Sequence, residues 1–240
     1  VNKVLSGMVC SVNPKIEGNL SLQQLCSFIP MEYVSDEFGT ITRQSIRPVA
    51  EVIKGYTFFR ENDVLFAKIT PCMENGKIAI AKNLKNGFGF GSTEFHVLRA
   101  NEGEITPHWI FYFLRQDKIR KDAERRMTGS AGQQRVPTSF LEEELEIPLP
   151  SLPEQKRIAA ILDKADRLRR QRRYAQALSD SFLQSIFIKM FGDHLKQDYP
   201  KTELINLVTI TGGGTPSREI EEYFKGKIAW LTSKDMKGDY

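Results

Sequence analysis

Residues 150–193 read PSLPEQKRIAAILDKADRLRRQRRYAQALSDSFLQSIFIKMFGD, and the rest of the chain is organised around them. Pro153 precedes Glu154, an acid that suits the positive first turn of a helix. No Gly or Pro interrupts the chain from there to Lys189, and Gly192 is the first residue that favours a helix end. The pattern predicts one uninterrupted helix of about 50 Å at ~1.5 Å per residue.

The apolar residues of this helix form a stripe at intervals of three and four, apart from one gap of seven near Arg172. Such a stripe packs against its own domain or against another helix, and both interpretations stay open. The length favours a spacer that meets a second helix in a coiled-coil-like contact. The predicted helix interface consists of Ile158, Ile161, Leu162, Ala165, Leu168, Ala175, Leu178, Phe182 and Ile186.

The composition is that of an ordinary globular protein, with 40% hydrophobic and 27% charged residues in 240. No apolar run approaches ~18 residues and no charged, then apolar, leader opens the chain, so we expect neither a membrane span nor a signal peptide. Cys10, Cys26 and Cys72 are odd in number and lack CxxC spacing, which favours a reduced, cytoplasmic protein without a metal site.

Charge is distributed unevenly. Residues 1–150 carry 18 basic and 18 acidic side chains, whereas residues 154–190 carry 9 and 4. The excess lies on the predicted helix, mainly between Arg167 and Arg173. Such a run is usually a solvated face and sometimes contacts phosphates or an acidic partner.

The pattern before the helix predicts an α+β fold. Residues 20–29 suit a short helix, and residues 107–119 a helix opened by Pro107. Between them, β-branched and aromatic runs alternate with turn residues, which predicts a curled, mostly antiparallel sheet or partial barrel. The predicted strands are residues 40–42, 49–53, 56–59, 64–69, 78–81 and 94–98.

No catalytic motif is present. Residues 212–214 are three glycines without the lysine of a P-loop, and GxSxG, HExxH and Asn/Asp-Pro-Pro-Tyr/Phe are missing. Glu74-x-x-Lys77 and Glu154-x-Lys156 resemble fragments of nuclease motifs, but no Pro-Asp pair precedes them. We therefore expect no catalytic residue in this chain.

The remaining polar chemistry suits DNA recognition. One side of residues 115–126 is basic, as phosphate contacts require, and two loops carry amide and basic side chains that suit base edges. His96 and Glu94 lie within a predicted strand and are expected to be buried and hydrogen-bonded rather than ligands. The predicted DNA-binding residues are Lys68, Thr70, Asn75, Lys77, Arg115, Lys118, Arg125, Arg126, Gln133, Gln134 and Arg135.

Four stretches, in this order along the chain, resemble a known family: DVLFAKITPCMENGK (63–77), GFGSTEFHVL (89–98), GSAGQQRVP (129–137) and IPLPSLPEQKRIAAILD (147–163). Together they resemble one target-recognition domain and the spacer helix of type I restriction–modification specificity subunits. MFGD (190–193) resembles the exit of that helix. GGTPS (213–217) and IAWL (228–231) resemble the opening of a second recognition domain.

The resemblance implies a recognition domain at residues 1–150, a spacer helix at 151–192 and the start of a second domain at 193–240. It implies a non-catalytic subunit that recognises half of a split sequence in double-stranded DNA and docks methyltransferase (M) subunits. S-adenosylmethionine, ATP and Mg would be used by the M subunits and a restriction/translocase (R) subunit, and none would bind this chain.

Three alternatives remain open. Either the second half of such a subunit has been removed, or a half-length subunit pairs with itself through the helix. A different possibility is the recognition module of a fused methyltransferase–nuclease whose catalytic part lies outside this chain. A helical scaffold that binds only protein would show no affinity for DNA.

Overall fold

The structure is a computed structural model that describes residues 2–130, 132–195, 202–209, 211–212, 214, 217 and 219–227. It divides into two compact units, Val1–Asp180 and Ser181–Tyr240. The first unit contains a mixed α+β domain and most of one long helix, which confirms the predicted fold class.

Among the described residues, ten short strands and five α-helices form the framework. The strands are β1 (Lys3–Leu5), β2 (Cys10–Val12), β3 (Leu25–Ile29), β4 (Ser45–Pro48), β5 (Thr57–Arg60), β6 (Val64–Ala67), β7 (Ile78–Ile80), β8 (Phe88–Gly91), β9 (Phe95–Ala100) and β10 (Glu146–Pro148). The helices are α1 (Ser6–Val9), α2 (Val49–Val52), α3 (Pro107–Leu114), α4 (Asp117–Glu124) and α5 (Leu152–Leu195), and Phe140–Glu144 forms a π-helical turn.

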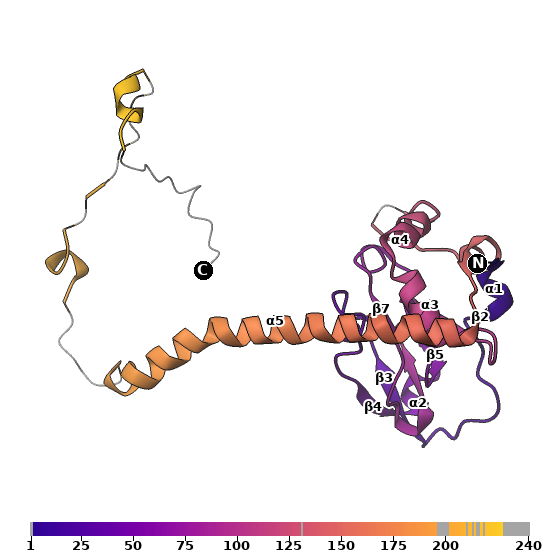
Figure 1. The fold of residues 1–240 in the computed structure, drawn as a ribbon. Helices are drawn as coiled ribbons and strands as arrows, with labels where there is room; N and C mark the ends of the chain where they lie inside the picture. The colour runs from indigo at the N-terminus through magenta and orange to yellow at the C-terminus, as the bar shows by residue number, and fades with distance from the viewer. Residues whose placement is uncertain are drawn as a thin grey trace. The chain divides into compact units, whose positions relative to one another are not determined.

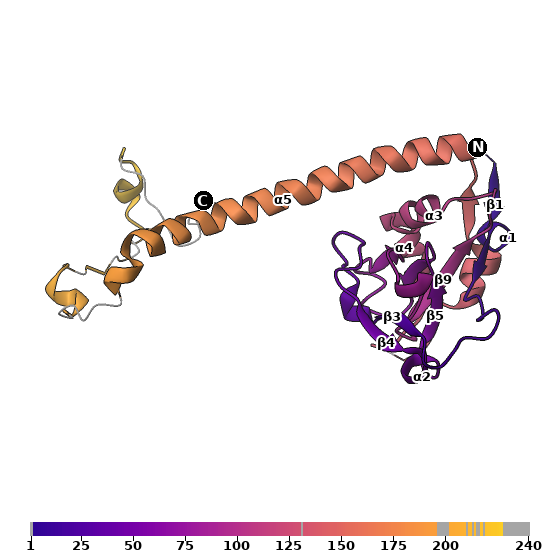
Figure 2. The ribbon, with the colours of Figure 1, turned by 90° about the horizontal axis from the view of Figure 1, so that it is seen from below.

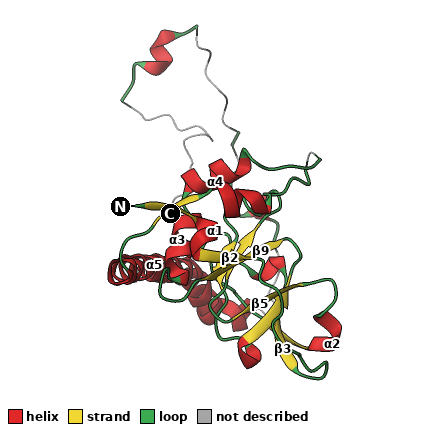
Figure 3. Ribbon diagram, turned by 90° about the vertical axis from the view of Figure 1, so that its right-hand side faces the viewer, coloured by secondary structure: helices red, strands yellow, loops and turns green. Residues whose placement is uncertain are grey.

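The strands form two four-stranded sheets, ordered β2-β9-β6-β7 and β4-β3-β8-β5, and the pair β1-β10. Every pairing is antiparallel except β3 with β8. Figure 3 shows strands of both larger sheets in the middle of the domain, with α4 and α2 at opposite ends. The predicted, mostly antiparallel architecture is therefore present, as two sheets rather than one.

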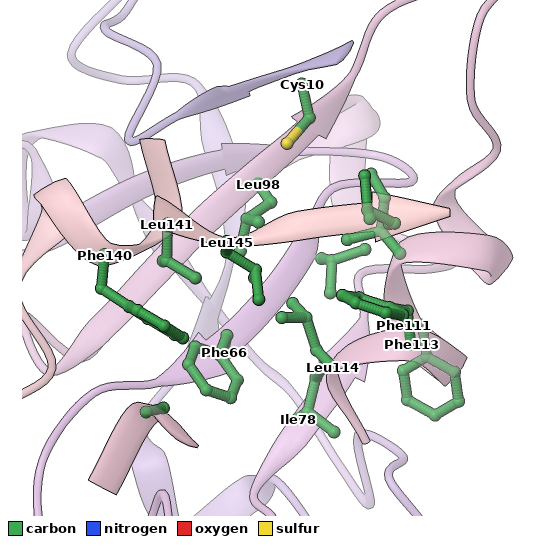
Figure 4. Close-up of a cluster of buried hydrophobic side chains, with 14 of the residues drawn as sticks. Cys10, Phe66, Ile78, Leu98, Phe111, Phe113, Leu114, Phe140, Leu141 and Leu145 are labelled. Atoms are coloured by element: carbon green, nitrogen blue, oxygen red, sulfur yellow. The ribbon is translucent and has the colours of Figure 1, made fainter. Parts of the chain in front are cut away.

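The largest core cluster lies where the β9-β6-β7 sheet meets α3 and the turn at residues 140–144. Phe66, Ile78, Phe111, Leu114 and Phe140 point into it, as Figure 4 shows, and each is at most 5% exposed. Burial of such side chains contributes roughly 1.5–3 kcal/mol each. This packing fixes α3 and the chain around residue 140 on one sheet.

The first turns of α5 lie against α3, which Figure 2 places between α5 and the sheets; Figure 1 gives a second view. The Tyr112 hydroxyl donates to Asp163 Oδ1 over 2.7 Å. Gln155 is fully buried: its Nε2 donates to the carbonyls of Glu104 and Pro150, and its Oε1 accepts from Thr106 N at 2.9 Å. The start of the long helix is thus bound to the domain by polar contacts.

Five local predictions were wrong. The predicted strand at residues 40–42 is absent, since Ile41 makes only an isolated bridge to Val34. Residues 25–29 form β3 rather than a helix because pairing with both β4 and β8 outweighs helical spacing. Residues 49–52 are a helical turn that begins after Pro48. The helix predicted for residues 107–119 ends at Leu114, because Gln116 is extended with ψ 135°. The long helix continues past Gly192 to Leu195, since one glycine costs a helix only about 1 kcal/mol.

In the second unit, the described residues after α5 include two 3-10 turns, Leu204–Asn206 and Glu221–Phe224. The motif predicted at residues 213–217 lies largely outside the described residues, and that at residues 228–231 entirely outside them. The described part of the chain contains no helix that is long and apolar enough to cross a membrane.

Candidate nucleic-acid interface

The two loops predicted to contact DNA lie side by side. Lys68 N donates to Glu94 O and Val136 N donates to Lys68 O, both over 2.9 Å, which extends the sheet beyond β6. Thr70 N donates to Gln134 O over 3.0 Å. We call residues 68–77 and 128–135 the loop pair. The structure therefore joins two stretches that the sequence separates by about fifty residues.

Arg135 of the loop pair forms an ion pair with Glu94, which lies just before β9. Arg135 Nε and Nη2 donate to the two Glu94 oxygens, each over 2.9 Å, and Nη1 donates to Gln133 O over 2.9 Å. The hydrogen bonds from Arg135 lower the pKa of Glu94, because they stabilise the carboxylate. Glu94 was predicted to be buried and hydrogen-bonded; it is bonded, and its side chain remains 24% exposed.

His96 lies beneath this pair and is 2% exposed, as predicted. Asn13 Oδ1 accepts from Val97 N over 3.0 Å, which turns the Asn13 amide nitrogen toward His96 Nδ1 at 3.1 Å. Nδ1 therefore accepts, and Nε2 donates to Val136 O over 2.8 Å. Burial lowers the pKa of His96, so the ring is neutral near pH 7.

Four predicted DNA-binding residues of the loop pair have unengaged polar ends. Lys68 is half-buried and Asn75, Gln133 and Gln134 are exposed; none makes a side-chain hydrogen bond with a described residue. The other two are engaged: Thr70 donates to Glu74, and Lys77 Nζ donates to Met31 O over 3.2 Å. The loop pair thus offers one cation, three amides and part of Arg135 to a ligand.

The loop pair is held against α4 at Gly76. This residue has φ +83°, and a Cβ there would lie 2.4 Å from Arg120 Nη1. Arg120 Nη1 donates to Glu74 O over 3.0 Å. Only glycine suits both this backbone conformation and the close approach of the arginine.

The predicted basic face of residues 115–126 is only partly available. Lys118 and Arg125 are exposed, and Lys118 has no ion-pair partner among the described residues. Arg126 bonds Asp122 and Glu144. Arg115 points away from this basic face, because α3 ends at Leu114 and the backbone is extended at Gln116. Its Nη1 donates to Asp166 of α5 over 2.6 Å, and its side chain is 15% exposed. The prediction that Arg115 belongs to a solvent-facing basic surface was wrong.

The basic run of α5 also contacts the domain. Arg169 Nη2 lies 3.2 Å from Asp166 Oδ1 and donates to Glu37 O over 3.1 Å. Arg173 pairs with the Glu37 carboxylate, and both guanidinium groups lie about 6 Å from the Phe38 ring. We call Glu37, Arg115, Asp166 and Arg169 the helix clasp.

The apolar stripe of α5 is largely exposed. Ile158 is half-buried, and Ile158, Leu162 and Ala165 line a groove of about 700 Å³ with Trp109. From Leu168 onward the stripe is exposed: Leu168, Leu178 and Phe182 are 55–58% exposed and Ile186 is 37% exposed, and Ile161 and Ala175 are exposed too. The first turns of α5 meet the domain through the buried Gln155 and Ala159, so packing on the domain does not explain the exposed Leu168 further along the stripe.

The described residues contain no group of three or more His, Cys, Asp or Glu side chains placed to hold a metal ion. The loop pair offers hydrogen-bond donors and acceptors and one unengaged lysine, Lys68. Such a surface can position and recognise a polar polymer by hydrogen bonds.

Comparison with known proteins identifies the family. A family model described as the type I restriction modification DNA specificity domain matches residues 28–176, more than half of the chain. This chain belongs to that family. The matched residues of the specificity domain include the whole loop pair and the helix clasp.

Two specificity subunits of type I restriction enzymes from Escherichia coli are similar to it. The EcoEI subunit is 43% identical over 156 residues, and the EcoAI subunit is 43% identical over 150. These alignments cover 65% and 62% of this chain but 26% and 25% of those subunits. The chain thus spans about a quarter of the length of these relatives.

A solved structure shares the fold of the specificity domain. The HsdS subunit from Thermoanaerobacter tengcongensis superimposes with a TM-score of 0.57 at 23% identity, over 85% of this chain and 51% of that one. The contacts that sequence reasoning missed are those of Glu37, Asp166, Gln155 and Glu94. Each joins residues more than 40 positions apart, so no local pattern could have indicated them.

Proposed function

We propose that this chain is the sequence-specific, non-catalytic DNA-recognition part of a type I restriction–modification complex. The observation that carries the proposal is the loop pair, where Lys68, Asn75, Gln133 and Gln134 keep unengaged polar ends in a chain of the DNA specificity family. Glutamine and asparagine pair with adenine edges, and arginine pairs with guanine edges. Lys118 and Arg125, exposed on neighbouring α4, would contact phosphates and position the domain on the duplex.

In this proposal α5 is the spacer that sets the distance between two recognised half-sites. The exposed stripe that includes Leu168 and Phe182 would pack on another helix, either from the remainder of the subunit or from a second copy. An exposed apolar helix face is removed from water only when another surface packs against it. The M subunits, with S-adenosylmethionine, and the R subunit, with ATP and Mg, would supply the catalysis.

The test combines this chain with its cognate M subunit, S-adenosylmethionine and genomic DNA, and maps the methylated adenines. Methylation confined to one split sequence is expected. Two identical inverted half-sites would mean that the chain works as a pair, and two different half-sites would mean that another recognition domain takes part. Unselective methylation, or the same pattern from the M subunit alone, would contradict the proposed function.

A further inference from the structure

We infer that Arg135 recognises a guanine in the DNA half-site and that Glu94 is the positioning residue that orients its guanidinium group. The inference rests on the proposed function and assigns a base to one side chain of the loop pair. Arg135 is the only arginine in residues 68–77 and 128–135. Its assignment follows from the donors that remain on the guanidinium group.

A guanidinium group has five N–H donors. Arg135 uses three of them: Nε and one on Nη2 bind Glu94, and one on Nη1 binds Gln133 O. One donor remains on each terminal nitrogen, and the side chain is 41% exposed. Two donors on adjacent nitrogens match the O6 and N7 acceptors that guanine presents in the major groove.

The guanidinium plane is held before DNA arrives. Arg135 N donates to Thr128 O over 2.8 Å, and Arg135 O accepts from Thr128 N at 3.0 Å, so the backbone is fixed. The two bonds to Glu94 then fix the end of the side chain. A side chain fixed in its binding geometry loses little conformational entropy on binding, which favours affinity and selectivity.

The neighbouring groups suit a guanine that lies in a duplex. Lys68 adds a cation beside the Arg135–Glu94 pair, and it contributes to the low pKa of Glu94. Gln133 and Gln134 provide free amides on the same loop for adjacent base pairs. Lysine cannot replace Arg135 in this geometry, because an ammonium group is a point donor rather than a planar fork.

The Arg135–Glu94 ion pair could serve only to hold the loop in place, and its contacts would then be the same. The experiment therefore needs a control ion pair of the same geometry outside the loop pair. Arg157 and Glu154 of α5 have the same two-bond geometry, with Nε and Nη2 donating over 2.8 and 2.7 Å. Neither lies in the loop pair or in the predicted helix interface. Arg157→Lys is therefore the control for Arg135→Lys.

The experiment first selects preferred duplexes from a randomised pool with the chain and its cognate M subunit. Each guanine of the selected sequence is then replaced by 7-deazaguanine, which lacks the N7 acceptor. Wild-type affinity is expected to fall about 10- to 100-fold at one guanine per half-site. Arg135→Lys should lose its preference for that guanine and its sensitivity to 7-deazaguanine, while Arg157→Lys keeps both. Glu94→Gln should weaken the same preference, because the amide that replaces the carboxylate has one oxygen rather than two to accept the Arg135 donors.

Three results would overturn the assignment: no selected guanine depends on N7, Arg135→Lys keeps the preference, or Arg135→Lys lowers affinity equally on all duplexes. The 7-deazaguanine measurement on wild-type protein needs no substitution, so a misfolded variant cannot decide it. A wild-type complex that selects a sequence without an N7-dependent guanine would contradict this assignment alone. A complex that selects no sequence would also contradict the proposed function.

Discussion

The helix clasp and the loop pair are both polar surfaces of the same domain, yet they differ in how their donors are used. In the clasp, Arg115 and Arg169 bond Asp166 and the Glu37 carbonyl. In the loop pair, Lys68, Gln133 and Gln134 make no side-chain hydrogen bond with a described residue. The clasp holds α5 on the domain, and the loop pair retains the capacity to bind a ligand.

This difference shows that charge alone does not locate a binding surface. The sequence places its largest basic excess between Arg167 and Arg173. Two of those arginines contact Glu37 and Phe38 of the domain. The segment of residues 1–150 has no net charge, yet the unengaged donors of Lys68, Gln133 and Gln134 lie together in the loop pair. Pairing, rather than composition, distinguishes a structural contact from an available one.

The largest expected effect tests the structural side of the comparison. Gln155→Ala leaves Thr106 N–H and the carbonyls of Glu104 and Pro150 without their buried partner. We expect the free energy of unfolding to fall by about 2–4 kcal/mol in urea titrations. The exposed Gln171→Ala, on the same helix, should change it by less than about 0.5 kcal/mol. Similar values for both variants would mean that the polar contact does not hold the helix.

The next effect tests which cations are available to DNA. Lys118 is exposed and unpaired among the described residues, whereas Arg169 bonds Asp166 and Glu37. Lys118→Ala should reduce the slope of log affinity against log salt by about 0.9 on non-specific duplex DNA. Arg169→Ala should leave this slope unchanged. A reduction by Arg169→Ala alone would reverse the roles assigned to the two surfaces.

The smallest effect concerns pH beneath the loop pair. Burial lowers the pKa of His96 in the folded state. As the pH falls below about 6.5, this histidine is therefore protonated first in the unfolded chain. Stability from this group is therefore present above pH 6.5 and lost as the pH falls toward its folded pKa. Protonation would also turn Nδ1 into a donor facing the Asn13 amide.

We expect the free energy of unfolding to decrease between pH 6.5 and 5.5 through His96, by at most about 1 kcal/mol for one group. His96→Gln should remove most of this dependence, and thermal melts across that pH range would measure it. Burial and Lys82 also lower the pKa of His108, so His108→Gln measures the separate contribution of that histidine in the same direction. An unchanged pH dependence in His96→Gln would place the titrating group elsewhere.

Local patterns predicted much of the fold. Periodicity and the position of Pro153 predicted the long helix, and β-branched runs predicted β5, β6, β7 and β9. The failures came where tertiary contacts outweigh local preference. Leu25–Ile29 has helical spacing but lies between two strands, and its buried backbone groups must be paired there.

The candidate site was predicted less completely, for a physical reason. Residue types indicated Gln133, Gln134 and Arg135, because a loop rich in glycine and amides has few structural uses. Whether a predicted residue keeps a free donor depends on its contacts in the fold: Arg115, Thr70 and Lys77 each donate to another residue of the chain. The partners of Arg115 and Lys77 lie on other elements, where no spacing rule connects them, whereas Glu74 is four residues from Thr70 in the same loop.

The sequence by itself indicated the long helix, several strands and the family, because these depend on residues that are close along the chain. The tertiary structure alone decided which polar groups are paired. Arg135 meets Glu94 across 41 positions, and Arg115 meets Asp166 across 51. Such contacts form only when folding brings distant segments together, and they determine whether a charge holds the protein together or is free to bind DNA.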